Sequence, residues 1–177
     1  MKQDLLIWLC LPAIILQGLL VKELINEKEI VKEIKEVPQA QAVEKTVDNR
    51  VDKLTCFFDQ YGSVLSSSAD TFITAADKNN IDYRVIAAIS FVESTACKHH
   101  IEGTNNCWGW GHGRIVFKSY DEAINVISER LAVSNYYRKW QADKEDYWKL
   151  AVVYNGGDQV KWHKDVVKTM EEIKLCR

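Results

Sequence analysis

The sequence lacks the patterns that mark several common classes of protein. Its 23 basic and 25 acidic residues are interleaved without a basic run, and the net charge of -2 gives no support for binding to nucleic acid. No C-x-x-C pair and no H-x-x-x-H pair occurs, so the standard spacings of zinc ligands are missing. We therefore expect no nucleic-acid partner, no cofactor and no bound metal.

A cleavage site is also missing after the longest apolar stretch, residues 5–21. This stretch, LLIWLCLPAIILQGLLV, is apolar apart from Gln17 and is just long enough to span a slightly thinned bilayer. No small-x-small pattern follows it, which favours a membrane anchor over residues 1–21 and weighs against a cleaved signal peptide. If the segment were cleaved, the protein would be secreted.

Two features make opposite predictions about the orientation of this anchor. Lys2 precedes the stretch and four lysines follow it within residues 22–35, so a count of positive charges places the rest of the chain in the cytoplasm. The cysteines and the chemistry described below favour export. We give more weight to the chemistry and expect a membrane-anchored protein whose folded domain lies outside the cytoplasm, in the cell envelope.

Residues 22–50 are predicted to form a charged stalk helix and a linker. Apolar residues recur between Val21 and Val37 over fewer than three heptads, which fits either a short coiled coil or a single solvated helix. The oligomeric state is left open for this reason. Pro38 ends the helix, and the polar residues after it are typical of a tether to one globular domain over residues 51–177.

The domain is predicted to be all-α, with at most a very short β segment near residues 112–118. Apolar residues recur at helical spacing in successive segments, and turn residues such as Gly62 and Asn79-Asn80 separate these segments. The expected helix caps are the Ser67–Asp70 pair, Asp82, the Ser119–Glu122 pair, Asp143 and Asp158.

The helix that begins after Asp82 is apolar almost all round, so we expect it in the centre of the domain. Glu93, near its C-terminal end, shares a face with Ile86 and Ile89. Partial burial and the negative end of the helix dipole both raise the pKa of a carboxyl group placed there. Glu93 is therefore predicted to stay protonated near neutral pH, as a general acid must. The simpler interpretation is a solvated glutamate at the rim.

Two cysteines bracket the loop that follows this helix. In an oxidising compartment Cys97 and Cys107 could form a disulfide and stiffen the wall beside Glu93. The alternative is a metal site that combines these cysteines with the histidines of the loop. A second pair, Cys56 with Cys176, would tie the ends of the domain together, although four cysteines allow three connectivities.

Glycine and tryptophan alternate in the segment Trp108-Gly109-Trp110-Gly111. Such a segment places flat apolar rings on a backbone that bends freely, and sugars bind by stacking their C–H faces on such rings. The amides of neighbouring asparagines can bond hydroxyl or acetamido groups. We expect one of the two tryptophans to fill the core instead, and Trp108 is the better candidate.

Tyr154 is predicted to lie on the buried face of a helix that Asn155-Gly156-Gly157 terminates. Its hydroxyl group then needs a hydrogen-bonding partner, and a buried acid is a natural one. Tyr154 and Glu93 would in that case face each other across a cleft.

Together these motifs resemble the lysozyme-like superfamily over about residues 54–174. A helix that ends in Glu93-Ser94 and a later Tyr154-Asn155-Gly156-Gly157 segment are similar to the soluble lytic transglycosylases. The segments NNCWGWG and FKSYDEAI are closer to the bacterial endo-β-N-acetylglucosaminidases of the same superfamily. The whole pattern looks most like the small, membrane-anchored bacterial members.

The resemblance implies a lysozyme-like domain that cleaves β-1,4 glycosidic bonds between GlcNAc and MurNAc in the glycan strands of peptidoglycan. Glu93 would be the catalytic acid in such a domain. The matching substrate contacts would come from Ser94, Asn106, Trp108, Tyr154 and Asn155, to which we add Trp110 as the second ring of the sugar platform.

Two departures from the family pattern leave the reaction open. The Gly-Leu-Met-Gln motif of the lytic transglycosylases is absent, and no second carboxylate stands in a recognisable motif. Glu102 is the preferred second carboxylate, ahead of Asp121 and Asp158. The enzyme could thus be a transglycosylase, a glucosaminidase or a muramidase. Two other functions stay open, a non-catalytic glycan-binding or scaffold module and a cytoplasm-facing metal protein.

Overall fold

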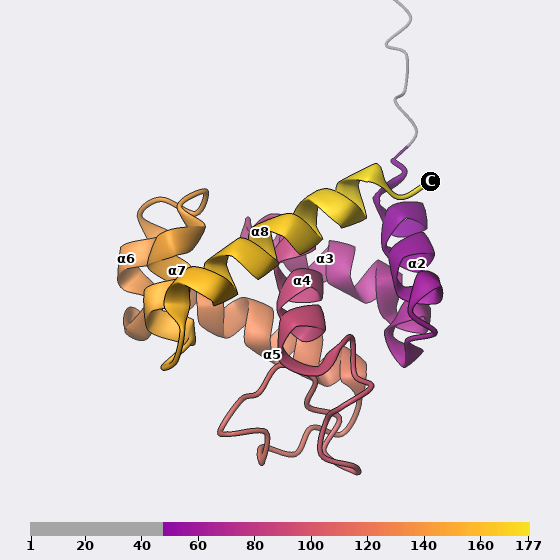
Figure 1. The fold of residues 1–177 in the computed structure, drawn as a ribbon, viewed down its shortest axis with the longest axis horizontal. Coiled ribbons are helices and arrows are strands. Elements are labelled where there is room, and N and C mark those ends of the chain that lie inside the picture. Colours follow the sequence, from indigo (N-terminus) through magenta and orange to yellow (C-terminus); the bar gives the residue numbers. More distant parts are fainter. Residues whose placement is uncertain (1–47) are drawn as a thin grey trace, which may run out of the picture. The chain divides into compact units, whose positions relative to one another are not determined.

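The computed structural model describes residues 48–177, which belong to one compact unit (Figure 1). The predicted anchor over residues 1–21 and most of the stalk and linker over residues 22–50 lie outside the described residues. Within residues 48–177 the chain forms seven α-helices and two short 3-10 helices and no strand, which confirms the all-α prediction for this part. No helix of the described part is long and apolar enough to cross a membrane.

The helices follow one another with short connections, except for the long loop after α4 that carries the tryptophans. Their bounds are α2 (Arg50–Gln60), η1 (Val64–Ser68), α3 (Ala69–Asn79), α4 (Tyr83–Ser94), α5 (Tyr120–Val133), η2 (Asn135–Tyr137), α6 (Arg138–Gln141), α7 (Tyr147–Tyr154) and α8 (Gln159–Leu175).

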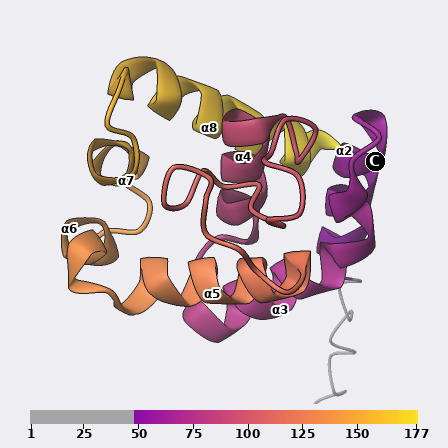
Figure 2. The ribbon, with the colours of Figure 1, turned by 90° about the horizontal axis from the view of Figure 1, so that it is seen from below.

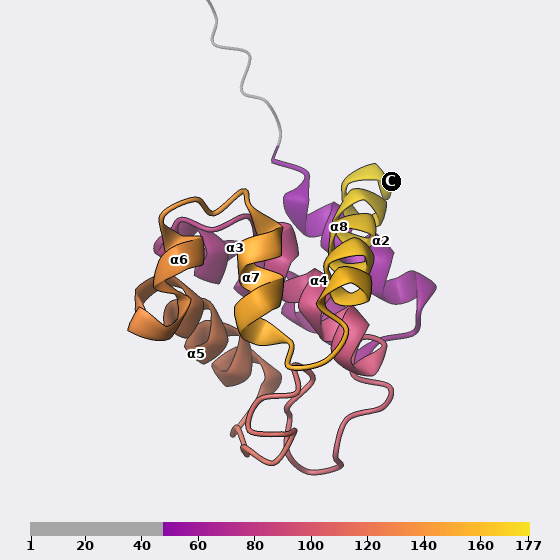
Figure 3. The same cartoon turned by 60° about the vertical axis from the view of Figure 1, so that its left-hand side comes forward.

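Helix α4 forms the centre of this arrangement, as its apolar sequence predicts. Every side chain from Val85 to Ser90 is buried. Helix α8 crosses α4 on one side, and α3 and α5 lie side by side on the other (Figures 1 and 2). Helix α7 packs beside α8 (Figure 3). The end of α4 and the loop that follows it therefore emerge between two groups of helices.

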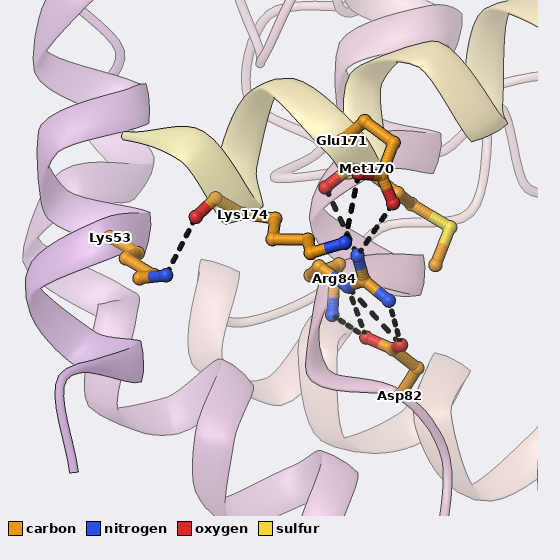
Figure 4. A network of polar contacts seen from close by, with 6 residues as sticks. All are labelled: Lys53, Asp82, Arg84, Met170, Glu171 and Lys174. Carbon is orange, nitrogen blue, oxygen red and sulfur yellow. Dashed lines mark hydrogen bonds and ion pairs between the residues drawn. The ribbon is translucent and has the colours of Figure 1, made fainter. Parts of the chain in front are cut away.

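A polar network fixes α8 to the start of α4 and to α2 (Figure 4). The Arg84 guanidinium is bound by Asp82 and also lies 3.3 Å from the Glu171 carboxylate on α8. Lys53 on α2 donates to the Lys174 carbonyl at 2.6 Å. These contacts join segments that are far apart in the sequence and hold α8 across the domain.

Both disulfides take the pairing that the sequence suggested. Cys56 and Cys176, with Cα atoms 5.9 Å apart, join α2 to the residue after α8. Cys97 and Cys107, with Cα atoms 4.8 Å apart, close the first part of the loop after α4. The metal alternative required free thiolates at Cys97 and Cys107, and the disulfide removes both.

The very short β segment that the prediction allowed near residues 112–118 does not form in the described structure. The Phe117 amide donates to the Thr104 carbonyl at 2.8 Å, but this single bond does not extend into a ladder. Side-chain amides take the neighbouring carbonyls instead. Asn105 donates to the Phe117 carbonyl at 2.8 Å, and Asn106 donates to the Ile115 carbonyl at 3.1 Å.

The predicted helix caps have mixed outcomes. Asp82, Ser119 and Asp158 accept hydrogen bonds from the first turns of α4, α5 and α8, which confirms all three. Ser67 does not cap α3, because its hydroxyl donates back to a carbonyl of the 3-10 helix that precedes α3. Helix α7 begins later than expected, because Asp146 rather than Asp143 accepts from its first turn.

Candidate active site

The Glu93 carboxyl group lies in the last turn of α4 and is held from two sides. Its Oε1 atom accepts a hydrogen bond of 2.7 Å from the indole Nε1 of Trp162, a buried residue of α8. On the other side lies Gly109 of the loop, where an added Cβ atom would meet Oε2 at 2.7 Å. Only glycine leaves room for the carboxylate at that distance, and its φ of +69° also favours glycine.

The surroundings of Glu93 change its proton affinity in the predicted direction. Glu93 is exposed at the surface, yet protein atoms crowd its carboxyl group, and this desolvation raises its pKa above the ordinary value. The Trp162 N–H opposes the shift, because it donates to the charged form. The net direction is upward, so the carboxyl group keeps its proton to a higher pH than a solvated glutamate does.

Tyr154 does not donate to Glu93, and the prediction of a direct bond was wrong. Its hydroxyl donates to the Trp108 backbone carbonyl at 2.7 Å. Its ring stacks on the Trp162 indole, with centroids 5.2 Å apart and an interplanar angle of 25°. Tyr154 therefore packs against the side chain that donates to Glu93 and has an indirect link to the acid. Burial, and then the negative charge of nearby Glu93, raise the pKa of the Tyr154 hydroxyl well above its usual value, so Tyr154 stays a neutral donor.

Trp108 fills the core, as expected for one of the two tryptophans. Its indole is fully buried and donates to the Ile86 carbonyl in α4 at 2.8 Å. The assignment of this ring to substrate contact was therefore wrong, because no face of it reaches solvent. Trp110 is partly exposed and lines the groove described below, so it is the ring that a ligand can reach.

Asn106 organises the loop rather than contacting solvent, which corrects its assignment as a glycan-binding residue. Its side chain is 2% exposed and all its hydrogen-bonding groups are engaged. The amide nitrogen donates to the carbonyls of Trp110 and Ile115, and the amide oxygen accepts from the backbone of Trp108 and Trp110. No donor or acceptor is left for a ligand.

Two further residues assigned to substrate contact also have internal roles. Ser94 is buried, and its hydroxyl lies 2.8 Å from the Cys107 carbonyl and accepts from the Cys97 amide at 3.0 Å. Ser94 thereby fastens the loop to α4. The Asn155 side chain accepts from the Gly157 amide and donates to the Asp158 carbonyl, which shapes the turn between α7 and α8.

A groove of about 760 Å³ is lined by Gly109, the residue whose added Cβ atom would meet the Glu93 carboxylate. Glu93 is not part of the lining, but its carboxylate lies next to this part of the wall, at the edge of the groove. The volume is typical of ligand sites, which occupy about 300–1,000 Å³. Four aromatic rings from the loop, η2 and α7 line the groove: Trp110, Tyr136, Tyr137 and Tyr154.

None of the three second-carboxylate candidates lines this groove. Glu102 is exposed in the loop, Asp121 is exposed in the first turn of α5, and Asp158 caps α8. Among the described residues, no carboxylate belongs to the groove lining itself, and Glu93 is the acid that adjoins it. The structure therefore brings Glu93, Trp110 and Tyr154 together and leaves Glu102 apart from them.

Sequence reasoning missed two residues of the site, Trp162 and Gly109. Trp162 lies on the buried face of α8, and its indole N–H is the donor that reaches Glu93. A buried tryptophan needs an acceptor for that group, and this requirement was the available signal.

Comparison of the chain with protein-family models, curated proteins and solved structures gave no match.

Proposed function

We propose that the protein is a lysozyme-like glycosidase that cleaves β-1,4 bonds between GlcNAc and MurNAc in peptidoglycan, with Glu93 as the general acid. The observation that carries the proposal is the setting of Glu93. A carboxyl group with a raised pKa is fixed by Trp162 and adjoins a groove lined with aromatic rings. A protonated acid beside stacking surfaces for sugar rings is what glycoside cleavage requires.

In the proposed reaction, the glycan strand lies in the groove with sugar rings against Trp110 and the tyrosines. Glu93 donates its proton to the oxygen of the scissile bond, and the bond to the leaving sugar breaks. The Trp162 N–H then stabilises the carboxylate that remains, because it donates to the charged form.

The nucleophile is proposed to come from the substrate. The groove lining contains no aspartate or glutamate among the described residues, which disfavours a second protein acid as base or nucleophile. In a lytic transglycosylase the 6-hydroxyl of MurNAc would attack C1 and give its proton to the Glu93 carboxylate. In a glucosaminidase the acetamido oxygen would attack C1, and water, losing its proton to the Glu93 carboxylate, would then open the ring that forms. Either route needs one protein acid.

Export is part of the proposal. The described domain carries two disulfides, which form and persist in oxidising compartments. We propose that the domain acts in the cell envelope, on the outer side of the membrane, where peptidoglycan is found. The N-terminal apolar stretch would keep it near that membrane.

The test is digestion of purified peptidoglycan by the parent protein and by Glu93→Gln, followed by mass spectrometry of the products. Gln keeps the size of the side chain and an acceptor for Trp162 but cannot donate a proton from a carboxyl group. We expect the variant to lose at least about a thousand-fold in rate while keeping its fold by circular dichroism. A 1,6-anhydro product identifies a transglycosylase, and the reducing sugar of any other product identifies a glucosaminidase or a muramidase. Undiminished cleavage by the variant contradicts the proposal, and wall binding without any product favours a non-catalytic glycan-binding module.

A further inference from the structure

Among the described residues, the groove lining contains one residue with a fully charged side chain, Arg130, and its charge is positive. Arg130 of α5 lines the groove, and its guanidinium makes no hydrogen bond or ion pair with any residue of the part of the chain described here. The residues three and four positions away in the sequence, on α5 or at its C-cap, carry no charge: Val126, Ile127, Val133 and Ser134. The guanidinium is thus free of the helix-surface partners that commonly neutralise an arginine.

Two other arginines of the domain, Arg50 and Arg84, are paired with carboxylates. Arg50 binds the carboxylates of Asp48 and Asp77, and Arg84 binds Asp82 with Glu171 close by. Both serve to hold helices in place. Arg130 has no such function, and Val126 of α5 and the C-cap residue Ser134 also line the groove.

The loop wall of the groove adds a second hydrogen-bond donor. His112 of the loop lines the groove and can donate a hydrogen bond from its ring in either protonation state. Tyrosine hydroxyls from η2 complete the polar part of the lining. The groove thus has an acid, Glu93, at its edge and a lining whose charge is positive.

A planar guanidinium with free N–H groups fits a carboxylate, which it binds through two parallel hydrogen bonds. A neutral polymer of GlcNAc offers no such group. A strand that contains MurNAc offers a carboxylate on the lactyl substituent or on the peptide attached to it. We infer that Arg130 is a specificity-determining residue that binds a carboxylate of the strand and makes the groove prefer substituted glycans to neutral ones. This inference rests on the proposed function and names the substrate class of the same site.

The experiment measures equilibrium binding of three tetrasaccharides to the full-length chain carrying Glu93→Gln, so that no substrate is consumed. The first is the neutral GlcNAc tetramer. The second alternates GlcNAc with MurNAc and has free lactyl carboxylates. The third carries a dipeptide on each lactyl group, so that the carboxylate lies farther from the ring. Each is measured with Arg130 present, with Arg130→Gln, and with Arg138→Gln, which removes the same charge from an exposed arginine outside the groove lining.

We expect the Arg130 protein to bind one or both carboxylate tetramers about five-fold more tightly than the neutral one at low salt. Arg130→Gln should lower the affinity for the carboxylate tetramers to that for the neutral tetramer, and Arg138→Gln should keep the preference. The tetramer that is preferred identifies the source of the carboxylate, lactyl group or peptide.

Equal affinities for all three tetramers, or a preference that survives Arg130→Gln, overturn the inference and leave the proposed function intact. Failure of every tetramer to bind overturns the sugar groove and both proposals with it. Continued cleavage of peptidoglycan by Glu93→Gln contradicts the general-acid assignment alone, since the binding preference does not depend on turnover.

Discussion

The Glu93 carboxyl group, the proposed general acid, is held by two neighbours. Trp162 binds Oε1 of Glu93, and Gly109 leaves space beside Oε2. The first contact fixes the orientation of the acid and favours its charged form, while the crowding around it favours the neutral form. The balance between these two effects sets the pH range over which Glu93 can donate a proton.

Replacing Trp162 with phenylalanine should move that range upward. The ring is largely kept, but the N–H that stabilises the carboxylate is lost, so the pKa of Glu93 should rise further. A general acid works only when protonated, so activity declines as the pH rises through its pKa. The decline should therefore shift to higher pH in Trp162→Phe, with a lower maximal rate because the acid is less well oriented.

Two measurements check this prediction: the pH profile of kcat and an NMR titration of the Glu93 carboxyl carbon. Trp148→Phe is the control, because Trp148 is exposed and packs against His163 rather than Glu93. An unchanged titration of Glu93 in Trp162→Phe would show that the indole does not act on the acid.

Replacing Gly109 with alanine should displace the carboxylate. The new Cβ atom would meet Oε2 at 2.7 Å, so either the loop or the acid must move. A shift of about 1 Å in a catalytic group costs on the order of a hundred-fold in rate, and we expect a loss of that order.

Gly62→Ala is a matched control for this change. Gly62 has a similar φ of +57°, against +69° at Gly109, but nothing lies within 4 Å of its added Cβ atom. Both variants should lose about 1–2 kcal/mol of stability from the left-handed backbone, measured by urea unfolding. Only Gly109→Ala should lose activity, and equal activities in the two variants would contradict the proposed contact.

At the scale of elements, the loop between α4 and α5 depends on internal polar contacts rather than on secondary structure. Ser94, Asn106 and the Cys97–Cys107 disulfide hold its backbone, and the carbonyl of Trp108 binds Tyr154. Several residues carried over from the family resemblance thus act by building the wall beside Glu93. Their loss would alter the site without removing any ligand contact.

The helices and several of their starts were predictable from local sequence. Asp82, Ser119 and Asp158 accept hydrogen bonds from backbone N–H groups two or three residues onward, so the signal is contained in a few adjacent positions. The buried face of α4 followed from its almost continuous apolar residues. The position of Glu93 at the end of that helix followed with it.

The contacts of the site were not predictable in this way. Glu93 and Trp162 are 69 positions apart, and their bond depends on how α8 crosses α4. The hydroxyl of Tyr154 was assigned the wrong acceptor, because it donates to a backbone carbonyl 46 positions away and not to a carboxylate. Every residue has a backbone carbonyl, so the sequence does not indicate which one will accept. Asn106 was misassigned because the sequence shows an asparagine but does not show whether its side-chain amide will bond a sugar or the protein backbone.

At the scale of the molecule, the two disulfides should contribute differently to stability and activity. In the loop-entropy account, closing the 120-residue separation of Cys56–Cys176 stabilises by about 5 kcal/mol, against about 3 kcal/mol for the 10-residue separation of Cys97–Cys107. Replacing both cysteines of a pair with alanine should therefore reduce the free energy of unfolding more for the first pair. Activity under conditions where both variants are folded should fall more for the second pair, which holds the loop beside Glu93. Urea unfolding and digestion of peptidoglycan measure the two effects, and the reverse order in either would contradict this division.

The Cys56–Cys176 bridge also makes residues 56–176 a closed covalent ring. A single backbone cut anywhere inside this ring opens it but releases no fragment, and a cut between Cys97 and Cys107 is spanned by a second, smaller ring. The exposed residues Ile101, Glu102 and Gly103 at the tip of the loop lie within both rings. A protease that cut there would leave one molecule that separates into two pieces only after both bridges are reduced.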